Sequence, residues 1–377
     1  MATMDPAQYD AAAYEALLLQ KMKQSELVVY HAAFAPASVS QDPVLLAATS
    51  TGHVHVFELA ALLKPEYWEN AQQSDRTPTP SLSFLAHPTQ IYTISFAGDA
   101  QDPLVVTLFV WNSGGDQDFR VWRWKHIAAA LKEDASDAGA RLEHVYVTHL
   151  DRKAMGYRGA LLPFSEINAI ATTRSQPQRV FLAGGDAIAH EWDLAAQACV
   201  AKYSGTHSDF LHSVQFVNHS QELVTGSEDG TVALWDARTS RHIETLTPQP
   251  KTSTKLGSTE TSSRWVGAVT TDTSETWLAC GGGSKMGRGG FVSMWHLPSR
   301  VPVHYTDTHA SDVHDLAYYH TDLLTVGNEA TLKKWNRSSG ALLSSARTSV
   351  SSAQFCVVDA ASDLIVLGVV SFSLALH

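Results

Sequence analysis

The sequence predicts an all-β fold, a seven-bladed propeller whose seventh blade is incomplete or divergent, preceded by a short N-terminal helix. Three observations support this prediction. Segments that end in an aromatic residue recur along the chain, and each follows a β-rich run and a tight turn. The spacings from Trp192 to Trp235 and from Trp295 to Trp335 lie close to the about 40–45 residues of a four-stranded blade. Six such segments and a weaker seventh fill the 377 residues.

The recurring segments share one local pattern. The aromatic residues that end them are Phe57, Trp122, Trp192, Trp235, Trp295 and Trp335. The two runs of each segment are joined by a turn of Gly, Asp, Asn or Ser, which predicts an antiparallel hairpin. In four segments an acidic residue stands six positions before the aromatic one: Asp116, Asp186, Asp229 and Glu329. A histidine precedes the following strand at His87, His207 and His309. A sandwich or jelly roll would not explain this repeated spacing.

The domain organisation follows from the same pattern. Residues 1–24 form an N-terminal helical extension, because Tyr14, Leu17, Leu18 and Met22 fall on one helical stripe. Residues 25–377 form the propeller, interrupted by insertions at 60–81, 125–160 and 247–262. The second insertion has helical periodicity and is expected on the rim, and the third is poor in apolar residues and expected to be flexible. Beyond Trp335 little chain is left for a full seventh blade, so either the N-terminal segment closes the ring or the last blade is truncated or divergent. An open edge strand would favour association.

Composition excludes several classes of protein. The net charge of −11 disfavours unaided binding of phosphate backbones, so RNA contact is expected to be indirect at most. Cys199, Cys280 and Cys356 lie far apart, which argues against a disulfide scaffold or zinc module and fits a reducing compartment. The acidic N-terminus is unlike a signal peptide, and the run LIVLGVV is too short for a membrane helix of about 20 residues. We therefore expect a cytosolic or nuclear protein.

No motif predicts catalysis. The 18 histidines include no H-E-x-x-H pattern, and no G-x-S-x-G is present. His53 and His55 share one face of a strand, which is compatible with a metal pair but more typical of an ordinary strand. The run CGGGSKMGRGG (280–290) lacks the spacing of a phosphate loop and predicts a long hairpin turn with Lys285 and Arg288 at its tip. Those two cations could contact RNA or an acidic partner. We expect a non-enzyme without catalytic residues, cofactor, metal or small-molecule substrate.

The repeated turn, acid and tryptophan resemble the WD-repeat β-propeller family. In that family His, Ser or Thr, Asp and Trp form a hydrogen-bonded tetrad in a blade. The resemblance implies one tetrad of His207, Thr225, Asp229 and Trp235, and a second of His309, Thr325, Glu329 and Trp335, in which Glu replaces Asp. Such a network makes physical sense, because a buried indole N–H and a buried imidazole both need hydrogen-bond partners.

The segment LVTGSEDGTVALWDAR (223–238) also resembles the box by which some WD proteins dock on the adaptor of cullin ubiquitin ligases. That resemblance implies a docking role for Asp236 and Arg238 and, as an alternative function, a ligase substrate receptor. The simpler interpretation is an ion pair at the blade edge, which contributes about 1 kcal/mol or less if it is exposed.

Segments including EINAI (166–170), FLAGGD (181–186) and MWHLPSR (294–300) are similar to WD-repeat subunits of the THO part of the transcription–export complex. This implies a non-catalytic nuclear scaffold that contacts other THO subunits and supports mRNA processing and export. Aromatic and Arg anchors are the expected contacts, namely Arg264 with Trp265, Tyr67 with Trp68, and the N-terminal helix. Alternatively, Trp265 belongs to the core, Tyr67 and Trp68 fold back on their own blade, and the helix caps one face.

Overall fold

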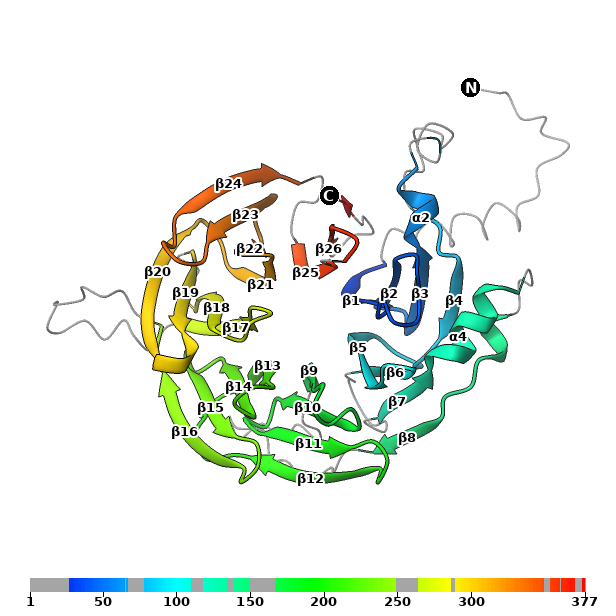
Figure 1. Cartoon of the computed structure of the whole chain (residues 1–377), viewed down its shortest axis with the longest axis horizontal. Coiled ribbons are helices and arrows are strands. Elements are labelled where there is room, and N and C mark those ends of the chain that lie inside the picture. The colour runs from blue at the N-terminus through cyan, green and yellow to red at the C-terminus, as the bar shows by residue number, and fades with distance from the viewer. Residues whose placement is uncertain are drawn as a thin grey trace, which may run out of the picture.

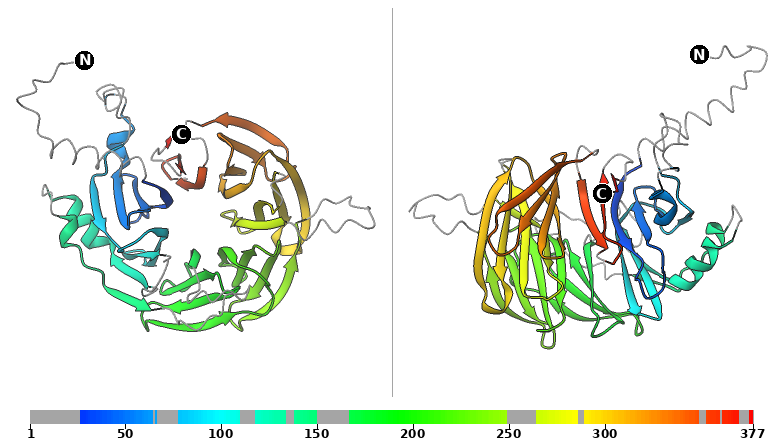
Figure 2. Two further views of the ribbon diagram at one scale, coloured as in Figure 1. Left: turned by 180° about the vertical axis from the view of Figure 1, so that it is seen from behind. Right: turned by 45° about the horizontal axis from the view of Figure 1, so that its top comes forward.

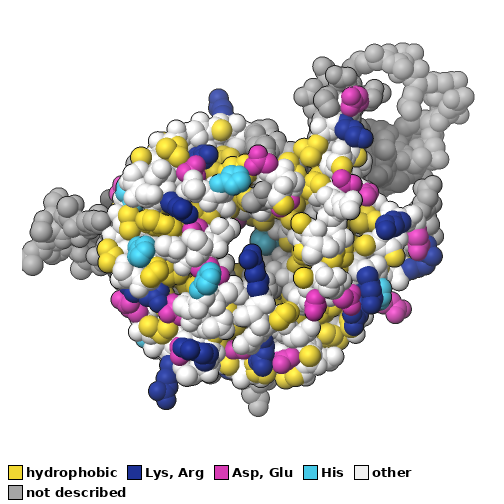
Figure 3. Space-filling view, in the orientation of Figure 1, with side chains coloured by type: hydrophobic (Ala, Val, Ile, Leu, Met, Phe, Trp, Pro, Cys, Tyr) yellow, Lys and Arg dark blue, Asp and Glu magenta, His cyan; other side chains and the backbone are white. Residues whose placement is uncertain are grey.

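The strands of the chain form a ring of sheets around a central hollow (Figures 1 and 3). The computed structural model describes residues 27–64, 66, 78–109, 118–133, 138–149, 167–248, 264–285, 289–348, 353–359, 361–369 and 375–376. Each sheet is antiparallel and is built from consecutive strands, so the chain completes one sheet before it begins the next. The first strand of each sheet lies nearest the centre, and the later strands lie progressively further out (Figure 1).

The first three blades occupy the N-terminal half of the ring. Blade 1 contains β1 (Val29–Phe34), β2 (Val44–Thr49), β3 (His53–Glu58) and β4 (Leu82–Leu85). Blade 2 contains β5 (Ile91–Asp99), β6 (Asp102–Phe109), β7 (Asp118–Arg123) and β8 (Tyr146–His149). Blade 3 contains β9 (Ile167–Thr172), β10 (Arg179–Gly184), β11 (Ala189–Asp193) and β12 (Ala198–Tyr203).

The remaining sheets follow in order. Blade 4 contains β13 (Leu211–Val217), β14 (Glu222–Ser227), β15 (Val232–Asp236) and β16 (Arg241–Leu246). Blade 5 contains β17 (Arg264–Thr271), β18 (Trp277–Ser284), β19 (Gly290–His296) and β20 (Val301–His309). Blade 6 contains β21 (Val313–Tyr319), β22 (Asp322–Gly327), β23 (Thr331–Asn336) and β24 (Leu342–Arg347). The last sheet contains β25 (Ala353–Asp359), β26 (Leu364–Val369) and β27 (Ala375–Leu376).

The all-β propeller is confirmed, but the number of full blades is six rather than seven. The last sector of the ring holds a three-stranded sheet, in which β27 pairs with β26 through only two residue pairs, Val366 with Leu376 and Leu367 with Ala375. The N-terminal helix expected over residues 1–24 lies outside the described residues.

Short helices lie outside the ring. The helix α2 (Leu59–Leu62) follows blade 1, and α4 (Trp124–Leu131) with the single turn η2 (Gly139–Arg141) projects from the rim beside blade 2 (Figures 1 and 2). The turn η4 (Leu297–Ser299) joins β19 to β20. Most of the third insertion, including residues 249–262, lies outside the described residues, as do Tyr67 and Trp68 of the first. No described helix is both long and apolar enough to cross a membrane.

The core lies between neighbouring blades. In blade 4 every residue of β14 is buried and β15 is buried up to Trp235, whereas β16 is exposed along most of its length. The middle strands are buried because each sheet packs face to face against the next. One apolar cluster joins Val224 and Leu234 of blade 4 to Cys280 and Trp295 of blade 5. The tryptophans that mark the repeats therefore contribute to packing between blades, and five of them are at most 6% exposed: Trp122, Trp192, Trp235, Trp295 and Trp335.

Every inner strand carries a β-bulge close to its first residue. The pairing with the second strand skips one residue in each sheet. The skipped residues are Tyr30, Tyr92, Asn168, His212, Gly267, His314 and Gln354. Bulges bend a strand and redirect side chains, and they are frequent beside functional sites. We call the end of the ring where the inner strands begin the bulge end.

The opposite end is bound together by contacts between loops of adjacent sheets. We call this end the loop belt, and its members are residues at the turns after the first and third strands of the sheets. The contacts run in sequence around the ring: Ser38 Oγ to Ala100 O (2.9 Å), Gly98 N to Pro177 O (2.7 Å), Arg174 N to Asn218 Oδ1 (2.9 Å), His219 N to Glu275 Oε2 (2.6 Å), Arg337 Nη1 to Asp272 Oδ2 (2.8 Å), and His320 Nε2 with Asp363 Oδ1 (3.2 Å). These contacts link the loops of adjacent sheets at this end.

Candidate functional site

The tetrad residues of blade 4 form one connected network. The His207 Nδ1 lies 3.0 Å from Asp229 Oδ2, and its Nε2 lies 2.8 Å from Thr225 Oγ1. The buried Trp235 indole donates its Nε1–H to the same Thr225 oxygen at 2.9 Å. Burial raises the pKa of Asp229, but the hydrogen bond and charge of His207 outweigh it and hold that pKa well below its usual range. This network joins the loop before blade 4 to its second and third strands.

Blade 6 has a different arrangement. Trp335 Nε1 donates to Thr325 Oγ1 at 2.9 Å, and Thr325 contacts His309 Nε2 at 3.1 Å, as in blade 4. However, Glu329 binds the ammonium of Lys333 at 2.9 Å and lies 3.7 Å from His309. Lys333 in turn lies 3.4 Å from His309 Nδ1. Burial, followed by the charge of Lys333, lowers the pKa of His309 to about 4, so this imidazole is neutral at physiological pH.

Blades 2 and 3 carry further variants that the sequence pattern did not reveal. In blade 2, His87 Nε2 contacts Thr107 Oγ1 at 2.8 Å, and Trp122 Nε1 donates to the same oxygen at 3.2 Å. The Thr107 acceptor was missed because the hairpin between β6 and β7 is longer than in blades 4 and 6, which shifts the spacing to Trp122. Asp116 lies outside the described residues.

In blade 3, Leu182 stands where blades 4 and 6 have a threonine, and Trp192 Nε1 has no hydrogen-bond partner among the described residues. His190 lies two positions before Trp192 and contacts Asp186 at 3.0 Å. Burial lowers the pKa of His190, but hydrogen bonds with Asp186 and Cys199 raise it to about 9. The imidazole of His190 is therefore protonated at neutral pH, and His190 occupies the position in blade 3 that Lys333 occupies in blade 6.

Asp236 and Arg238 form a local pair at the end of β15. Arg238 Nε donates to Asp236 Oδ1 at 3.1 Å, and the backbone N–H of Arg238 donates to the same oxygen at 2.9 Å. The Arg238 side chain is 70% exposed. The hydrogen bonds from Arg238 lower the pKa of Asp236. Arg238 is therefore oriented by its own neighbour and is open to solvent.

Arg264 and Trp265, adjacent in β17, lie in different surroundings. The Arg264 guanidinium lies 5.2 Å from the ring centre of Tyr305 and 5.6 Å from that of Phe291, so it packs within blade 5. Trp265 is half-buried. Its ring centre lies 5.7 Å from that of His212 in blade 4 and 6.4 Å from that of His314 in blade 6. The structure thus brings three ring side chains from three blades together at the bulge end, and we call His212, Trp265 and His314 the Trp265 cluster.

Charged residues of the neighbouring loops lie at the same end. Lys285 pairs with Asp209 at 3.2 Å and with Glu228 at 3.7 Å. Glu228 also lies 3.6 Å from His212. Burial is the main cause that lowers the pKa of His212, and the nearby carboxylates oppose it. Lys285, predicted at the tip of a hairpin turn, is therefore tied to blade 4, while Arg288 lies outside the described residues.

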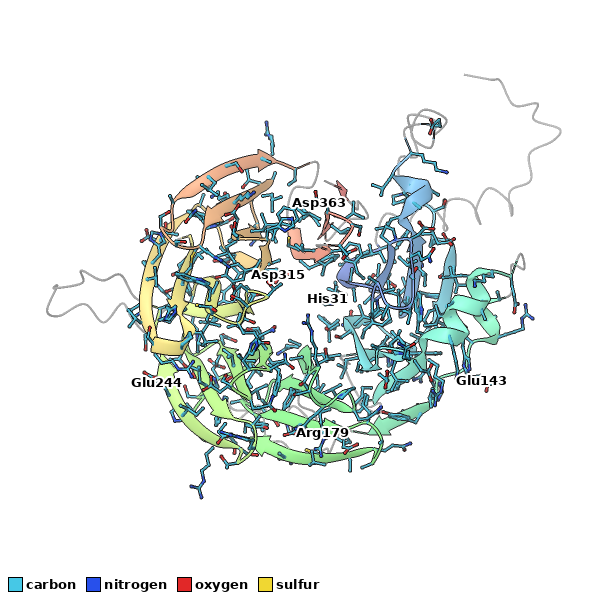
Figure 4. All side chains as sticks on the ribbon, in the orientation of Figure 1. His31, Glu143, Arg179, Glu244, Asp315 and Asp363 are labelled. Atoms are coloured by element: carbon cyan, nitrogen blue, oxygen red, sulfur yellow. The ribbon has the colours of Figure 1, made fainter. Side chains whose placement is uncertain are left out.

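The inner strands also place two buried titratable groups near the centre of the ring. Figure 4 shows His31 and Asp315 near the centre of the ring, while Glu143, Arg179 and Glu244 lie further out. Asp315 accepts the backbone N–H of Cys356 at 2.8 Å and so links β21 to β25. Burial raises the pKa of Asp315 to about 7, against the effect of its backbone hydrogen bonds. Burial likewise lowers the pKa of His31, which contacts the carbonyl of Ile94, to about 4.

No metal centre is built from the described side chains, since no group of three or more His, Cys, Asp or Glu is placed to hold an ion. His53 and His55 stack with ring centres 6.3 Å apart, and His55 Nδ1 contacts Ser83 Oγ at 2.9 Å. This arrangement favours the ordinary strand interpretation.

Comparison with known proteins matches the chain to one β-propeller family and to several similar proteins. Residues 177–371 match the family described as nucleolar protein 10-like, N-terminal domain, a β-propeller. The chain is similar to THO complex subunit 6 of Arabidopsis thaliana, at 28% identity over 90% of this chain and 86% of the relative. It is 26% identical to THO complex subunit 6 of Homo sapiens, over 85% of this chain and 80% of the relative. The homologue from Mus musculus is 26% identical over 86% of this chain and 80% of the relative.

Proposed function

This chain belongs to the family of nucleolar protein 10-like N-terminal β-propeller domains, and we propose that it is a non-catalytic subunit of a THO complex. The observation that carries the proposal is the likeness to proteins named THO complex subunit 6, which spans 90% of this chain and 86% of the plant relative. A match over most of both lengths supports a shared role more strongly than a shared blade would, because one fold serves many functions.

In this role the ring is a rigid scaffold that holds other THO subunits in place within the nucleus and supports mRNA processing and export. Contacts with RNA are indirect, since the net charge of −11 opposes binding to phosphates. The outer strands β16 and β24 support the scaffold role. Both are largely exposed, and they carry Ile243, Leu342 and Leu343 at 44%, 48% and 51% exposure. Exposed strands with apolar side chains are suited to contacts with other proteins.

The proposal is tested by purifying the tagged full-length protein from its own cells and identifying its companions. We expect the other THO subunits to co-purify in fixed stoichiometry and to survive washing at high salt and treatment with ribonuclease. A matched variant, Leu342→Ser with Leu343→Ser, should weaken this association if β24 contributes, while the melting temperature stays near that of the wild type. Recovery of a stoichiometric assembly that contains no THO subunit would contradict the proposal.

Docking on a cullin-ligase adaptor is a second candidate, supported by one observation. Arg238 is 70% exposed and is oriented by Asp236 directly after the buried Trp235. If this pair docks on the adaptor, Arg238→Ala should abolish adaptor pull-down without lowering the melting temperature, because the pair is exposed. Arg241→Ala, which alters an exposed cation in the same blade, is the matched control. Unchanged pull-down by Arg238→Ala would end this candidate.

A further inference from the structure

We propose that Trp265 and Asp312 form a receptor for a single arginine side chain of a partner protein, at the bulge end of blades 5 and 6. This recognition site goes beyond membership of any particular assembly. The fold places this indole and carboxylate together, and the isolated protein is enough to test their binding.

Two glycines create the space for this pair. A Cβ added to Gly283 would lie 1.9 Å from Asp312 Oδ1 and 2.9 Å from Trp265 Nε1, so both polar atoms approach the same point. A Cβ added to Gly267, the bulge residue of β17, would lie 2.4 Å from Trp265 Cζ3. Because side chains at either position would displace the indole or the carboxylate, glycine at both positions is a condition for their present arrangement.

The indole is held from two sides by neighbouring blades. His212 and His314 are themselves bulge residues, and their rings flank Trp265 at the centroid distances given above. His314 is fixed by a contact of 2.8 Å between its Nε2 and Asn328 Oδ1. Trp265 is therefore ordered by blades 4 and 6 although it is only half-buried, which reduces the side-chain entropy that would be lost on binding.

The charges around this site favour a cation. Within the described part of the chain, the Asp312 carboxylate has no hydrogen bond or ion pair, and Trp265 Nε1 has no acceptor. Lys285 is held by Asp209 and Glu228 of blade 4. Arg264 is directed to Tyr305 and Phe291. A positive ligand therefore meets an unpaired carboxylate and an aromatic ring, whereas a phosphate would meet several carboxylates.

An arginine fits this pair better than other cations do. The planar guanidinium can stack on an indole while its N–H groups donate to a carboxylate, and a lysine ammonium lacks this combination. The opposite end of the ring offers less for such a ligand, because its loops use their polar groups on one another in the loop belt. The geometry thus favours a protein segment that presents arginine to the bulge end.

The site is tested by fluorine NMR of the full-length protein labelled with 5-fluorotryptophan. The resonance of Trp265 is assigned as the one missing in Trp265→Phe, and the other tryptophan resonances report that each variant is folded. Eleven-residue Gly/Ser peptides with a central Arg, Lys or Gln are then titrated. We expect the Arg peptide to shift the Trp265 resonance, the Lys peptide to bind more weakly, and the Gln peptide to leave it unchanged.

The variant Asp312→Asn should weaken binding of the Arg peptide by about tenfold, because a charge-assisted contact is lost. Asp236→Asn, which alters a carboxylate at the end of β15 near the loop belt, should bind as the wild type does. Equal shifts with the Arg and Gln peptides, or full affinity in Asp312→Asn, would overturn the proposal. A shift of the same resonance by a single-stranded RNA oligonucleotide but not by the Arg peptide would also overturn it.

Discussion

The ammonium of Lys333 lies 3.4 Å from Nδ1 of His309, where Asp229 approaches the corresponding histidine in blade 4. Lys333 carries its own counter-ion, Glu329, at 2.9 Å, and its side chain is only 11% exposed. A cation has thus entered a network that elsewhere contains a carboxylate and an imidazole. Blade 3 has the same solution with His190 and Asp186. In both blades the residue two positions before the tryptophan supplies the positive charge.

We expect Glu329→Gln to destabilise the protein by about 3 kcal/mol, because the largely buried charge of Lys333 would lose the carboxylate that binds it at 2.9 Å. The double variant Glu329→Gln with Lys333→Met should recover most of this loss. Lys334→Met changes a more exposed neighbour on the same strand and serves as the control. The free energy of unfolding in urea measures all three variants. A double variant as unstable as Glu329→Gln would show that the charge of Lys333 is not the cause.

The pair of His190 and Asp186 predicts a dependence of stability on pH. The pKa of His190 is about 9 in the folded protein and near 6.5 when unfolded. Its contribution, up to about 3 kcal/mol, is fully present below pH 6.5 and is lost as pH rises through 9. His190→Gln should therefore be less stable than the wild type at pH 6, and the difference should shrink towards pH 9.5. Asp186→Asn should reduce the same pH dependence, and a constant difference at all pH values would contradict it.

Asp315 predicts a pH dependence of stability in which the protonated, uncharged carboxyl group is the form favoured in the folded protein. Its pKa of about 7 in the folded protein lies above the ordinary value near 3.8, so the folded state holds the proton more tightly. Stability from this group is present below pH 3.8 and declines as pH rises through 7. Relative to the wild type, Asp315→Asn should gain about 2 kcal/mol between pH 5 and pH 8, since an amide carries no buried charge. Melting temperatures at both pH values test this, and an equal effect at both would refute it.

Thr225 is the shared partner of a histidine and a tryptophan, so its hydroxyl matters more than its size. Thr225→Val should lower the free energy of unfolding by about 2–4 kcal/mol, because His207 Nε2 and Trp235 Nε1 both lose their partner. Thr225→Ser keeps the oxygen and should be markedly more stable than Thr225→Val. If the two variants unfold at the same urea concentration, packing rather than hydrogen bonding determines the role of this residue.

The repeat was predictable from sequence because five of the blades bury an indole at a corresponding place in a hairpin. The spacing from Thr225 to Trp235 recurs from Thr325 to Trp335, and there the residue pattern and the hydrogen bonds agree. Thr107 was not predicted as the hydrogen-bond acceptor of Trp122, because an insertion lengthens the sequence distance between them without changing the place of Thr107 in the sheet. Leu182 shows the converse, since it keeps the spacing but has no hydroxyl, and Trp192 Nε1 is left without a partner in the described chain.

Contacts between blades were beyond the reach of local patterns. Asn218 and Glu275 bind residues of neighbouring blades more than 40 positions away along the chain, and no local periodicity encodes such pairs. The bulges were missed for a related reason, because an extra residue such as His212 is visible only when the partner strand is known. The Trp265 cluster depends on three bulged strands and two glycines, so the sequence could propose Trp265 as a contact but could not assemble its surroundings.

The last sheet and blade 1 are not joined by strand pairing within the described residues. No ladder joins β1 to β25 or β26 within the described residues, and Val29, Leu45, Phe355 and Val366 meet there in one apolar cluster. Among the described residues this junction is held by apolar packing, whose strength falls on cooling. At low temperature the ring should therefore open first at the junction between the last sheet and blade 1. Amide hydrogen exchange at low temperature tests this, because the amides of β1 and β25 should exchange faster than those of the inner strands of the other blades.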